Sequence, residues 1–407
     1  MTSRTRCFAL VACVVFGAVG ADWPQFLGPQ RNGVSTETGL LQTWDAKGPP
    51  VLWRKDVGEG FSAPVIAVDR LILFHRVGDE EMVECLDAAT GERKWKHTDP
   101  TRYQDPLGKG DGPRSTPLIA GEQVYTLSPG GRLLCLKLSD GAKVWQRELL
   151  KDYKVPRSFF GVGTSPILEG GRVLINVGAR DAGIVAFDKD SGKEVWKATG
   201  DGASYSSPVA TTIDGVRHIL FFTRQGIVSL DPANGAVRFS KPWRSRMDAS
   251  VNAATPIVVS DQVFFTACYE TGAILVRAKK DSIEEVWSND RSLSCHFGTP
   301  VYHDGCLYGF HGRQETGTEM RCVDIKTGRV HWSQEGFGCG SIILAEGNLI
   351  VLSEAGELVL IEGKSDKYRE KARAAVLAGP CRAHMALANG RLYARDNKKL
   401  ACWSLKK

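Results

Sequence analysis

Beyond its first 21 residues the sequence has no apolar run that approaches the length of a membrane-spanning helix. Lys and Arg total 52 against 46 acidic residues, and no basic block stands out, so the electrostatic footprint of a nucleic-acid-binding protein is missing. The sequence also lacks the G-x-S-x-G, H-E-x-x-H and phosphate-loop motifs. These absences argue against a membrane-spanning protein, a nucleic-acid partner and the enzyme classes that use those motifs.

The N-terminus differs from the rest of the chain. MTSRTRCFALVACVVFGAVGA combines Arg4 and Arg6 with an apolar run and with small residues at a cleavage position. We interpret residues 1–21 as a signal peptide, which predicts secretion across the inner membrane to the periplasm and no transmembrane segment after cleavage. The stretch LVAC at residues 10–13 leaves a lipid anchor at Cys13 as the less favoured alternative.

Long helical patterns are also scarce, whereas the 44 glycines exceed an average share of roughly 7% and indicate many turns. The most regular feature is a motif that first appears as LDAATGERKW, residues 86–95. It returns at 136–145, 187–196, 230–239 and 323–332, each time with a glycine four residues before a closing aromatic. A weaker copy, AKKDSIEEVW, ends at Trp287.

Each motif closes a longer unit, which opens with small residues and a proline, as in STPLIAG at 115–121. Two further apolar segments follow, and the glycine of the motif suits the left-handed position of a hairpin turn. Short antiparallel strands in units of four, repeated at intervals of roughly 40 to 50 residues, are typical of propeller blades. The sequence therefore predicts an all-β fold.

The ends of the chain settle the number of blades. Six units are clear, and residues 340–362 begin a seventh. The last segment, AHMALANGRLYARDNKKLACWSL, supplies three strands, and PPVLWRK near Trp53 is a strand with no blade before it. Pairing the two ends completes an eighth blade and removes exposed sheet edges. We predict an eight-bladed propeller of four-stranded antiparallel blades over residues 50–407, closed by N- and C-terminal strands and preceded by a leader segment, residues 22–49.

The closing aromatics are best explained as packing between blades, because a buried tryptophan provides roughly 150 to 250 Å² of contact. We expect this docking role for Trp53, Trp95, Trp145, Trp196, Trp287 and Trp332.

The cysteines do not suggest a disulfide scaffold, because nine of the eleven follow residue 21 and an odd number cannot all pair. Four share one repeat position, namely Cys85, Cys135, Cys322 and Cys402. We expect small buried side chains there, with a disulfide or a metal as alternatives. The Cys and His residues at 295, 296, 303 and 306 flank one strand and would point to opposite faces, so we predict no metal site.

The xDxxTGxxxW motif and the proline-initiated first strand resemble the pyrroloquinoline-quinone (PQQ) repeat over about residues 50–407. Eight-bladed propellers of this family include quinoprotein alcohol dehydrogenases and the BamB lipoprotein of the outer-membrane β-barrel assembly machinery. The leader DWPQFLGPQRNGVS, residues 22–35, is similar to the opening of secreted bacterial proteins that carry the repeat.

The resemblance leaves two functions open. The BamB-like branch implies a monomeric binding or assembly scaffold, with a protein or peptide partner at the cell envelope and no cofactor. The dehydrogenase branch implies oxidation of alcohols or sugars by PQQ, held in the funnel beside Ca²⁺ with an Asp base and a disulfide between adjacent cysteines. This sequence has no Cys-Cys pair, and no C-x-x-C-H for covalent haem. We therefore favour the scaffold and predict no catalytic residues.

The repeat register also locates a candidate binding surface at the channel mouth. The residue three places before each blade's proline, or its equivalent, should ring the channel: Phe61, Arg114, Gly163, Tyr205, Ala253, Phe297, Cys339 and Arg382. Ring closure would place Arg114 and Arg382 on either side of Phe61, with His384 and Arg157 near the same level and with Tyr205 and Phe297 opposite.

We expect this arc of two cations around an aromatic to hold a carboxylate of a partner, because Arg presents a planar fork of donors. The alternative is that both arginines pair with local carboxylates such as Asp111.

Overall fold

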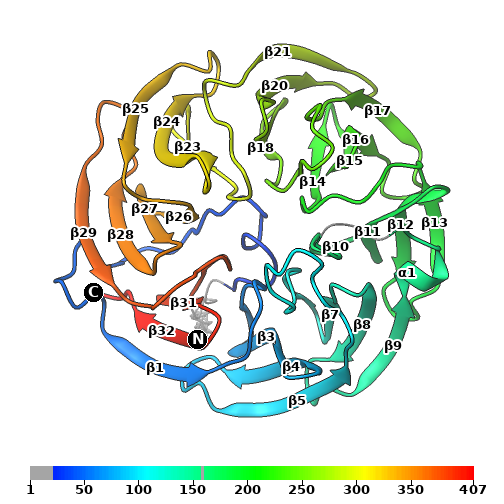
Figure 1. Cartoon of the computed structure of the whole chain (residues 1–407), viewed down its shortest axis with the longest axis horizontal. Helices are drawn as coiled ribbons and strands as arrows, with labels where there is room; N and C mark the ends of the chain where they lie inside the picture. Colours follow the sequence, from blue (N-terminus) through cyan, green and yellow to red (C-terminus); the bar gives the residue numbers. More distant parts are fainter. Residues whose placement is uncertain (1–21, 157–159) are drawn as a thin grey trace, which may run out of the picture.

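The computed structural model describes residues 22–156 and 160–407, and in these residues 32 strands form eight four-stranded antiparallel sheets around a central channel (Figure 1). The same residues contain one short helix, α1 (Leu149–Asp152). Within this part of the chain, no helix has the length and apolar character needed to cross a membrane. The prediction of an all-β, eight-bladed propeller is confirmed. The predicted signal peptide and the alternative anchor at Cys13 lie outside the described residues.

Each blade runs outward from a short first strand beside the channel to a fourth strand at the rim (Figure 1). Blade 1 consists of β2 (Val65–Ala67), β3 (Arg70–Val77), β4 (Glu80–Asp87) and β5 (Arg93–Pro100), and blade 2 of β6 (Leu118–Ala120), β7 (Gln123–Leu127), β8 (Arg132–Lys137) and β9 (Lys143–Glu148). Blade 3 consists of β10 (Ile167–Glu169), β11 (Arg172–Ala179), β12 (Ala182–Asp188) and β13 (Glu194–Ala198), and blade 4 of β14 (Val209–Ile213), β15 (Val216–Phe222), β16 (Gly226–Leu230) and β17 (Val237–Pro242).

Blades 5 to 7 repeat the pattern. Blade 5 consists of β18 (Ile257–Val259), β19 (Gln262–Ala267), β20 (Gly272–Ala278) and β21 (Ile283–Asn289). Blade 6 consists of β22 (Val301–His303), β23 (Cys306–Arg313), β24 (Gly317–Asp324) and β25 (Val330–Glu335). Blade 7 consists of β26 (Gly340–Ala345), β27 (Asn348–Ser353), β28 (Glu357–Glu362) and β29 (Glu370–Ala375).

Blade 8 joins the two ends of the chain. The C-terminal strands are β30 (Ala386–Ala388), β31 (Arg391–Arg395) and β32 (Lys399–Ser404), and the fourth strand is β1 (Val51–Asp56). Strand β1 pairs antiparallel with β32, so that Trp53 lies opposite Cys402. The ring is therefore closed by strands from both ends, as predicted.

The core lies between neighbouring blades, which stack face to face. The third strand of a blade is buried on both faces, as in β8, whereas the fourth strand is only partly buried, as in β9. One hydrophobic cluster joins Val65 and Phe74 of blade 1 to Ile119 and Leu134 of blade 2. Because each blade buries its faces only against its neighbours, stability depends on the contacts between blades.

The recurring motif makes these contacts. In the turn of the LDAATGERKW copy, Gly91 has a φ of +75° and the indole of Trp53 from the preceding blade lies against it, so that a Cβ there would come within 2.7 Å of the ring. The Nε1–H of Trp53 donates to the backbone oxygen of Ala88 at 3.2 Å. The glycine is thus required both by its left-handed backbone and by the indole packed on it.

The same contact is repeated around the ring. Trp95, Trp145 and Trp196 lie on Gly141, Gly192 and Gly235 of the next blade. Each of the six closing tryptophans also donates its indole N–H to a backbone oxygen of the next blade, the acceptors being Ala88, Leu138, Lys189, Pro232, Ile325 and Lys364.

The repeated cysteine position has a related cause. Cys85 pairs across the strands with Trp95, and Cys135 with Trp145. A small side chain there leaves room for the neighbouring indole. The nine cysteines of the described chain are all buried free thiols.

Candidate functional site

The channel holds a cavity of about 440 Å³ on the axis of the ring. Seven of the eight residues picked out by the repeat register line it, namely Phe61, Arg114, Gly163, Tyr205, Ala253, Phe297 and Arg382. His384 lines it too, whereas Cys339 is buried and is not among the lining residues. Arg157 lies outside the described residues.

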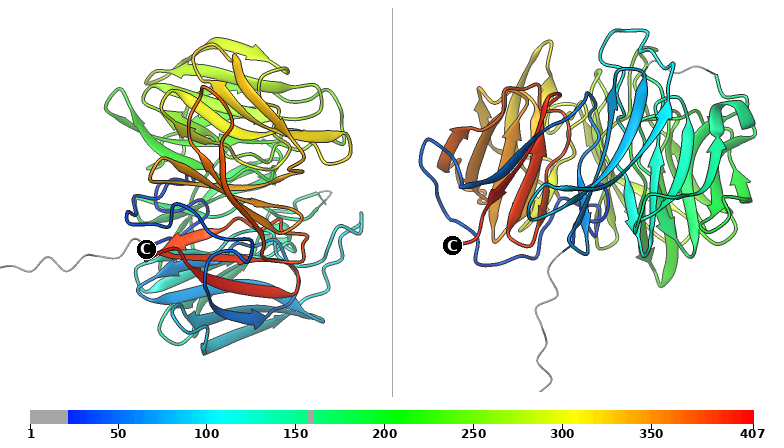
Figure 2. Two further views of the ribbon diagram at one scale, coloured as in Figure 1. Left: turned by 90° about the vertical axis from the view of Figure 1, so that its left-hand side faces the viewer. Right: turned by 90° about the horizontal axis from the view of Figure 1, so that it is seen from below.

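The leader crosses one end of this channel (Figures 1 and 2). Trp23 exchanges two backbone hydrogen bonds with Ile66 in blade 1, and the oxygen of Pro24 accepts from Ile119 in blade 2. On the other side of the ring, Gly33 and Leu344 of blade 7 are joined by a backbone hydrogen bond. Segment 22–35 is thus attached to blades on both sides of the channel and covers this end of it.

Two leader side chains reach into the ring. The ring of Phe26 lines the cavity and meets His384 edge-on, with 4.9 Å between the ring centres. Arg31 is buried and donates to the backbone oxygens of Ser165 and Pro166 in blade 3, at 3.2 and 3.0 Å. Burial lowers the pKa of Arg31 to about 9.

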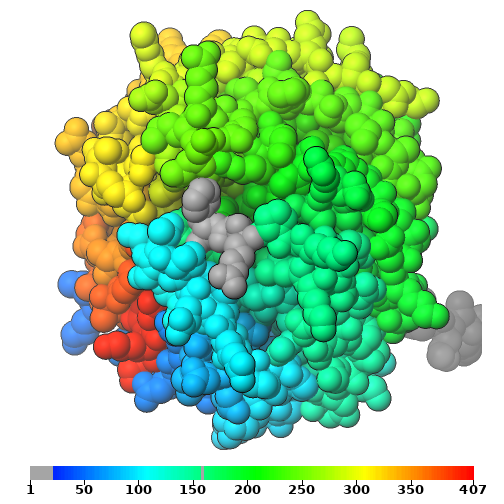
Figure 3. Space-filling model, turned by 45° about the vertical axis from the view of Figure 1, so that its right-hand side comes forward, coloured from blue at the N-terminus to red at the C-terminus, as the bar shows by residue number. Residues whose placement is uncertain are grey.

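The loop of residues 101–114 stands at the opposite face of the disc, where it protrudes in cyan (Figures 2 and 3). Asp105, whose side chain is fully buried, organises this loop by accepting the N–H groups of Leu107 and Lys109 at 2.9 and 3.1 Å. The same carboxylate accepts from Arg114 at 2.6 Å, and Arg114 also donates to the oxygen of Gly110 at 2.9 Å. Arg114 therefore holds the loop to the rim of the cavity.

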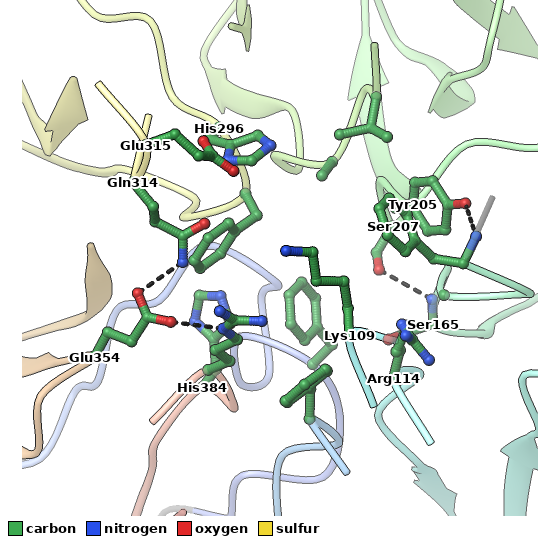
Figure 4. A pocket seen from close by; sticks show the side chains of 18 residues that line it. Lys109, Arg114, Ser165, Tyr205, Ser207, His296, Gln314, Glu315, Glu354 and His384 are labelled. Atoms are coloured by element: carbon green, nitrogen blue, oxygen red, sulfur yellow. Dashed lines mark hydrogen bonds and ion pairs between the residues drawn. The ribbon is translucent and has the colours of Figure 1, made fainter. Parts of the chain in front are cut away.

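Arg382 is held in a similar way from the other side. Its Nε donates to Glu354 at 2.6 Å, and the second oxygen of Glu354 accepts from Gln314 at 2.6 Å (Figure 4). The guanidinium groups of Arg114 and Arg382 lie 5.6 and 5.5 Å from the centre of the Phe61 ring. The structure thus brings the two cations to either side of this aromatic.

Both arginines are paired with local carboxylates, but these carboxylates are not Asp111, which the sequence had suggested. Asp105 pairs with Arg114 and Glu354 pairs with Arg382, whereas Asp111 accepts the backbone N–H of Asp105 at 2.7 Å. The conformation of the 101–114 loop decides this, because it turns Asp105 inward under the arginine.

Sequence reasoning missed Lys109, which lies on the same loop. Its side chain is exposed and points into the cavity beside the aromatic rings (Figure 4). In the part of the chain that the structure describes, no carboxylate lies within 4.0 Å of its Nζ. Lys109 has no place in the repeat register, so its position depends on the loop alone.

The other polar groups of the cavity serve the ring itself. The backbone N–H of Ser165 donates to the hydroxyl of Ser207 in the next blade, and the Ser165 hydroxyl accepts from Thr116 in the preceding blade, both at 3.0 Å. These residues precede the proline of each blade, which explains the small hydroxyl residues there. Tyr205 accepts the N–H of Phe160 at 2.9 Å.

Two histidines line the cavity, and burial favours the neutral form of both rings. Burial lowers the pKa of His384 to about 4, and burial is also the main cause that lowers the pKa of His296. The Nε2 of His296 is hydrogen-bonded to the hydroxyl of Tyr269 at 2.8 Å.

A protein-family profile described as outer membrane protein assembly factor BamB matches residues 28–158 and 152–334, which is most of the chain. The chain belongs to this BamB family.

Relatives of known sequence fall into two groups. BamB from Burkholderia pseudomallei (strain K96243) is 29% identical over 251 residues, which cover 56% of this chain and 57% of that protein. Quinohemoprotein alcohol dehydrogenase ADH-IIG from Pseudomonas putida is 28% identical over 151 residues, or 36% of this chain and 20% of that enzyme. The matches thus span little more than half of one relative and a fifth of the other.

Two solved structures represent the same two groups. BamB from Moraxella catarrhalis has a TM-score of 0.64 at 16% identity, covering 88% of this chain and 97% of its own. Quinohemoprotein alcohol dehydrogenase from Comamonas testosteroni has a TM-score of 0.70 at 13% identity, covering 95% and 81%. The predicted resemblance to BamB-like and quinoprotein propellers is confirmed, and at these identities the structures establish a shared fold.

The carboxylates that line the cavity do not fit the Ca²⁺ ion expected beside PQQ. Ca²⁺ takes carboxylate and carbonyl oxygens, yet of the two carboxylates lining the cavity, Glu354 is bound by Arg382 and Gln314, and Glu315 pairs with Arg313 at 3.3 Å. Across residues 22–156 and 160–407, no group of three or more His, Cys, Asp or Glu side chains is arranged to hold a metal ion.

Proposed function

We propose that this protein is a non-catalytic binding scaffold of the cell envelope, which engages a protein or peptide partner at the mouth of its channel. The family match over residues 28–334 is the observation that carries this proposal. The cavity is the proposed binding site, because it combines aromatic walls with polar groups that are held in place at its rim. We further propose that the chain is periplasmic, acts as a monomer and needs no cofactor.

The fixed positions of the two arginines at the rim of the cavity support a binding role. Arg114 and Arg382 are each anchored by a buried or half-buried carboxylate, so their geometry is set before a partner arrives. Preorganised groups lose little conformational freedom on binding, which favours recognition. The serines at the cavity wall are engaged in bonds between blades.

A cavity-filling variant tests this proposal. Ala253→Trp places a large ring in the cavity, whereas Ala233→Trp adds the same ring to an exposed hairpin. Wild type and both variants serve as baits for an envelope extract, with melting temperatures measured in parallel. We expect Ala253→Trp alone to lose partner capture. Undiminished capture by a folded Ala253→Trp protein would move the binding surface to an outer blade edge.

The alternative is a PQQ-dependent dehydrogenase, which the local match to the Pseudomonas putida quinohemoprotein alcohol dehydrogenase favours. The purified chain would be titrated with PQQ and Ca²⁺ and assayed for dye reduction with alcohols and sugars. Saturable binding with turnover would replace the scaffold proposal by the enzyme.

A further inference from the structure

The leader covers one end of the cavity, and this limits what can enter it. Segment 22–35 lies across one end, attached to blades 1, 2, 3 and 7. A polypeptide that passed through the ring would need a second opening, and an internal loop would have to fit two chains through one mouth. A chain end needs only one opening and the width of one chain.

The walls favour an apolar side chain. Aromatic rings from the leader and from blades on opposite sides line the cavity: Phe26, Phe61, Phe160, Tyr205 and Phe297. His384 adds a neutral ring because its pKa is low. The volume of about 440 Å³ falls at the lower end of the range of ligand pockets, roughly 300 to 1,000 Å³, and suits one or two residues.

Among the described residues that line the cavity, Lys109 is a cation without an ion-pair partner. The charges of Arg114 and Arg382 are paired at 2.6 Å with Asp105 and Glu354. Lys109 projects its side chain into the cavity (Figure 4), and its backbone N–H is fixed to the buried Asp105 carboxylate. The loop thus presents an ammonium group beside aromatic walls, and no carboxylate of residues 22–156 and 160–407 lies within ion-pair distance of it.

We propose that the cavity binds the C-terminal residue of a partner polypeptide, with its carboxylate on Lys109 and its apolar side chain against the aromatic walls. This inference rests on the proposed function and specifies the part of the partner that is recognised. Capture of a terminal carboxylate is an established mode of peptide recognition. Here the covered end of the cavity favours a chain end over a continuous chain, and the ammonium group of Lys109 binds the terminal carboxylate.

The test uses the full chain and fluorescein-labelled hexapeptides. One peptide ends in Phe with a free carboxylate, a second is its C-terminal amide, and a third ends in Ser with a free carboxylate. Binding is measured by fluorescence anisotropy. We expect the first peptide to bind at least about tenfold more tightly than either of the others, a difference of about 1.4 kcal/mol.

Three substitutions test whether Lys109 and the cavity are responsible for the difference in affinity. Lys109→Ala should reduce the affinity of the acid to that of the amide and leave the amide unchanged, whereas Lys326→Ala, at an exposed hairpin, should change neither. Ala253→Trp should abolish binding of both. Equal binding of acid and amide by wild type, or a Lys109→Ala protein that behaves like Lys326→Ala, would overturn the inference.

A competition experiment separates a chain end from a free small acid. If 3-phenylpropionate displaces the Phe peptide at equal concentration, the peptide backbone contributes nothing and the assignment to a polypeptide is wrong. If no peptide binds but capture from the envelope extract remains sensitive to Ala253→Trp, the inference fails and the scaffold proposal stands. If that capture is also insensitive, both fail.

Discussion

Trp145 offers a direct test of how the blades are held together. Its side chain is 8% exposed and packs on Gly192 of the next blade, where a Cβ would lie 2.6 Å from the indole. Its Nε1–H donates to the oxygen of Lys189 at 2.9 Å. Trp145→Ala would remove this contact from the boundary between blades 2 and 3 and leave the channel lining unchanged.

The expected cost follows from these contacts. Truncation of a buried Phe or Trp to Ala costs about 3 to 5 kcal/mol. The oxygen of Lys189 would keep a donor within reach, because the Tyr125 hydroxyl, which is shared with Gln123 Oε1, lies 3.1 Å from it. No buried acceptor is orphaned, so we expect the lower part of that range, about 3 to 4 kcal/mol.

A double-mutant cycle with Gly192→Ala separates packing from backbone strain. At its φ of +66°, alanine costs about 1 to 2 kcal/mol by itself, and the clash with the indole adds about 1 to 3 kcal/mol. In the Trp145→Ala background only the strain should remain. The two substitutions should therefore be less costly together than their sum, by about 1 to 3 kcal/mol.

Urea unfolding, followed by far-ultraviolet circular dichroism, gives the free energy of unfolding of all four proteins of the cycle. Trp145→Phe is added as a variant that keeps an aromatic ring at this position. Additive costs, or a Trp145→Ala protein that unfolds at the urea concentration of wild type, would refute the docking role.

Two further predictions concern ring closure and pH. Deleting residues 22–56 removes β1 from β32 and the Trp53 contact with Gly91, so we expect aggregation or failure to fold; a soluble monomer with the wild-type melting temperature on size-exclusion chromatography and thermal melting would contradict this. Burial raises the pKa of Glu81 to about 7, so the folded state holds a proton that the unfolded chain, with a pKa of about 4.3, releases earlier. Stability should therefore fall as pH rises from about 4.5 to 7. Glu81→Gln should gain stability over wild type at pH 7.5 but not at pH 5 in urea unfolding, and parallel pH profiles would show this interpretation to be wrong.

The repeat made much of the cavity predictable. Because each blade places its first strand at the same offset from a proline, residues far apart in the sequence, such as Phe61 and Arg382, could be assigned to one ring. Their proximity needed only the blade count and closure of the ring. The docking tryptophans were predictable for the same reason, since each motif carries its own glycine and aromatic.

Residues outside the repeat could not be placed in this way. Lys109 and Asp105 belong to a loop whose conformation depends on hydrogen bonds to one buried carboxylate, and no periodicity encodes it. The leader was expected as a segment before the propeller, but its path across the channel could not be inferred. That path depends on backbone pairing of Trp23 with Ile66 and of Gly33 with Leu344.

The sequence by itself determined the all-β repeat, the number of blades and the closure by β1, because these follow from local patterning and from the need to pair every edge strand. Tertiary structure alone decided which charges remain available in the channel. Arg114 and Arg382 were both candidate carboxylate ligands by register, yet Asp105 pairs with Arg114 from within the same loop and Glu354 pairs with Arg382 from the preceding blade. An ion pair depends on distances of a few ångströms, which only the folded loops establish.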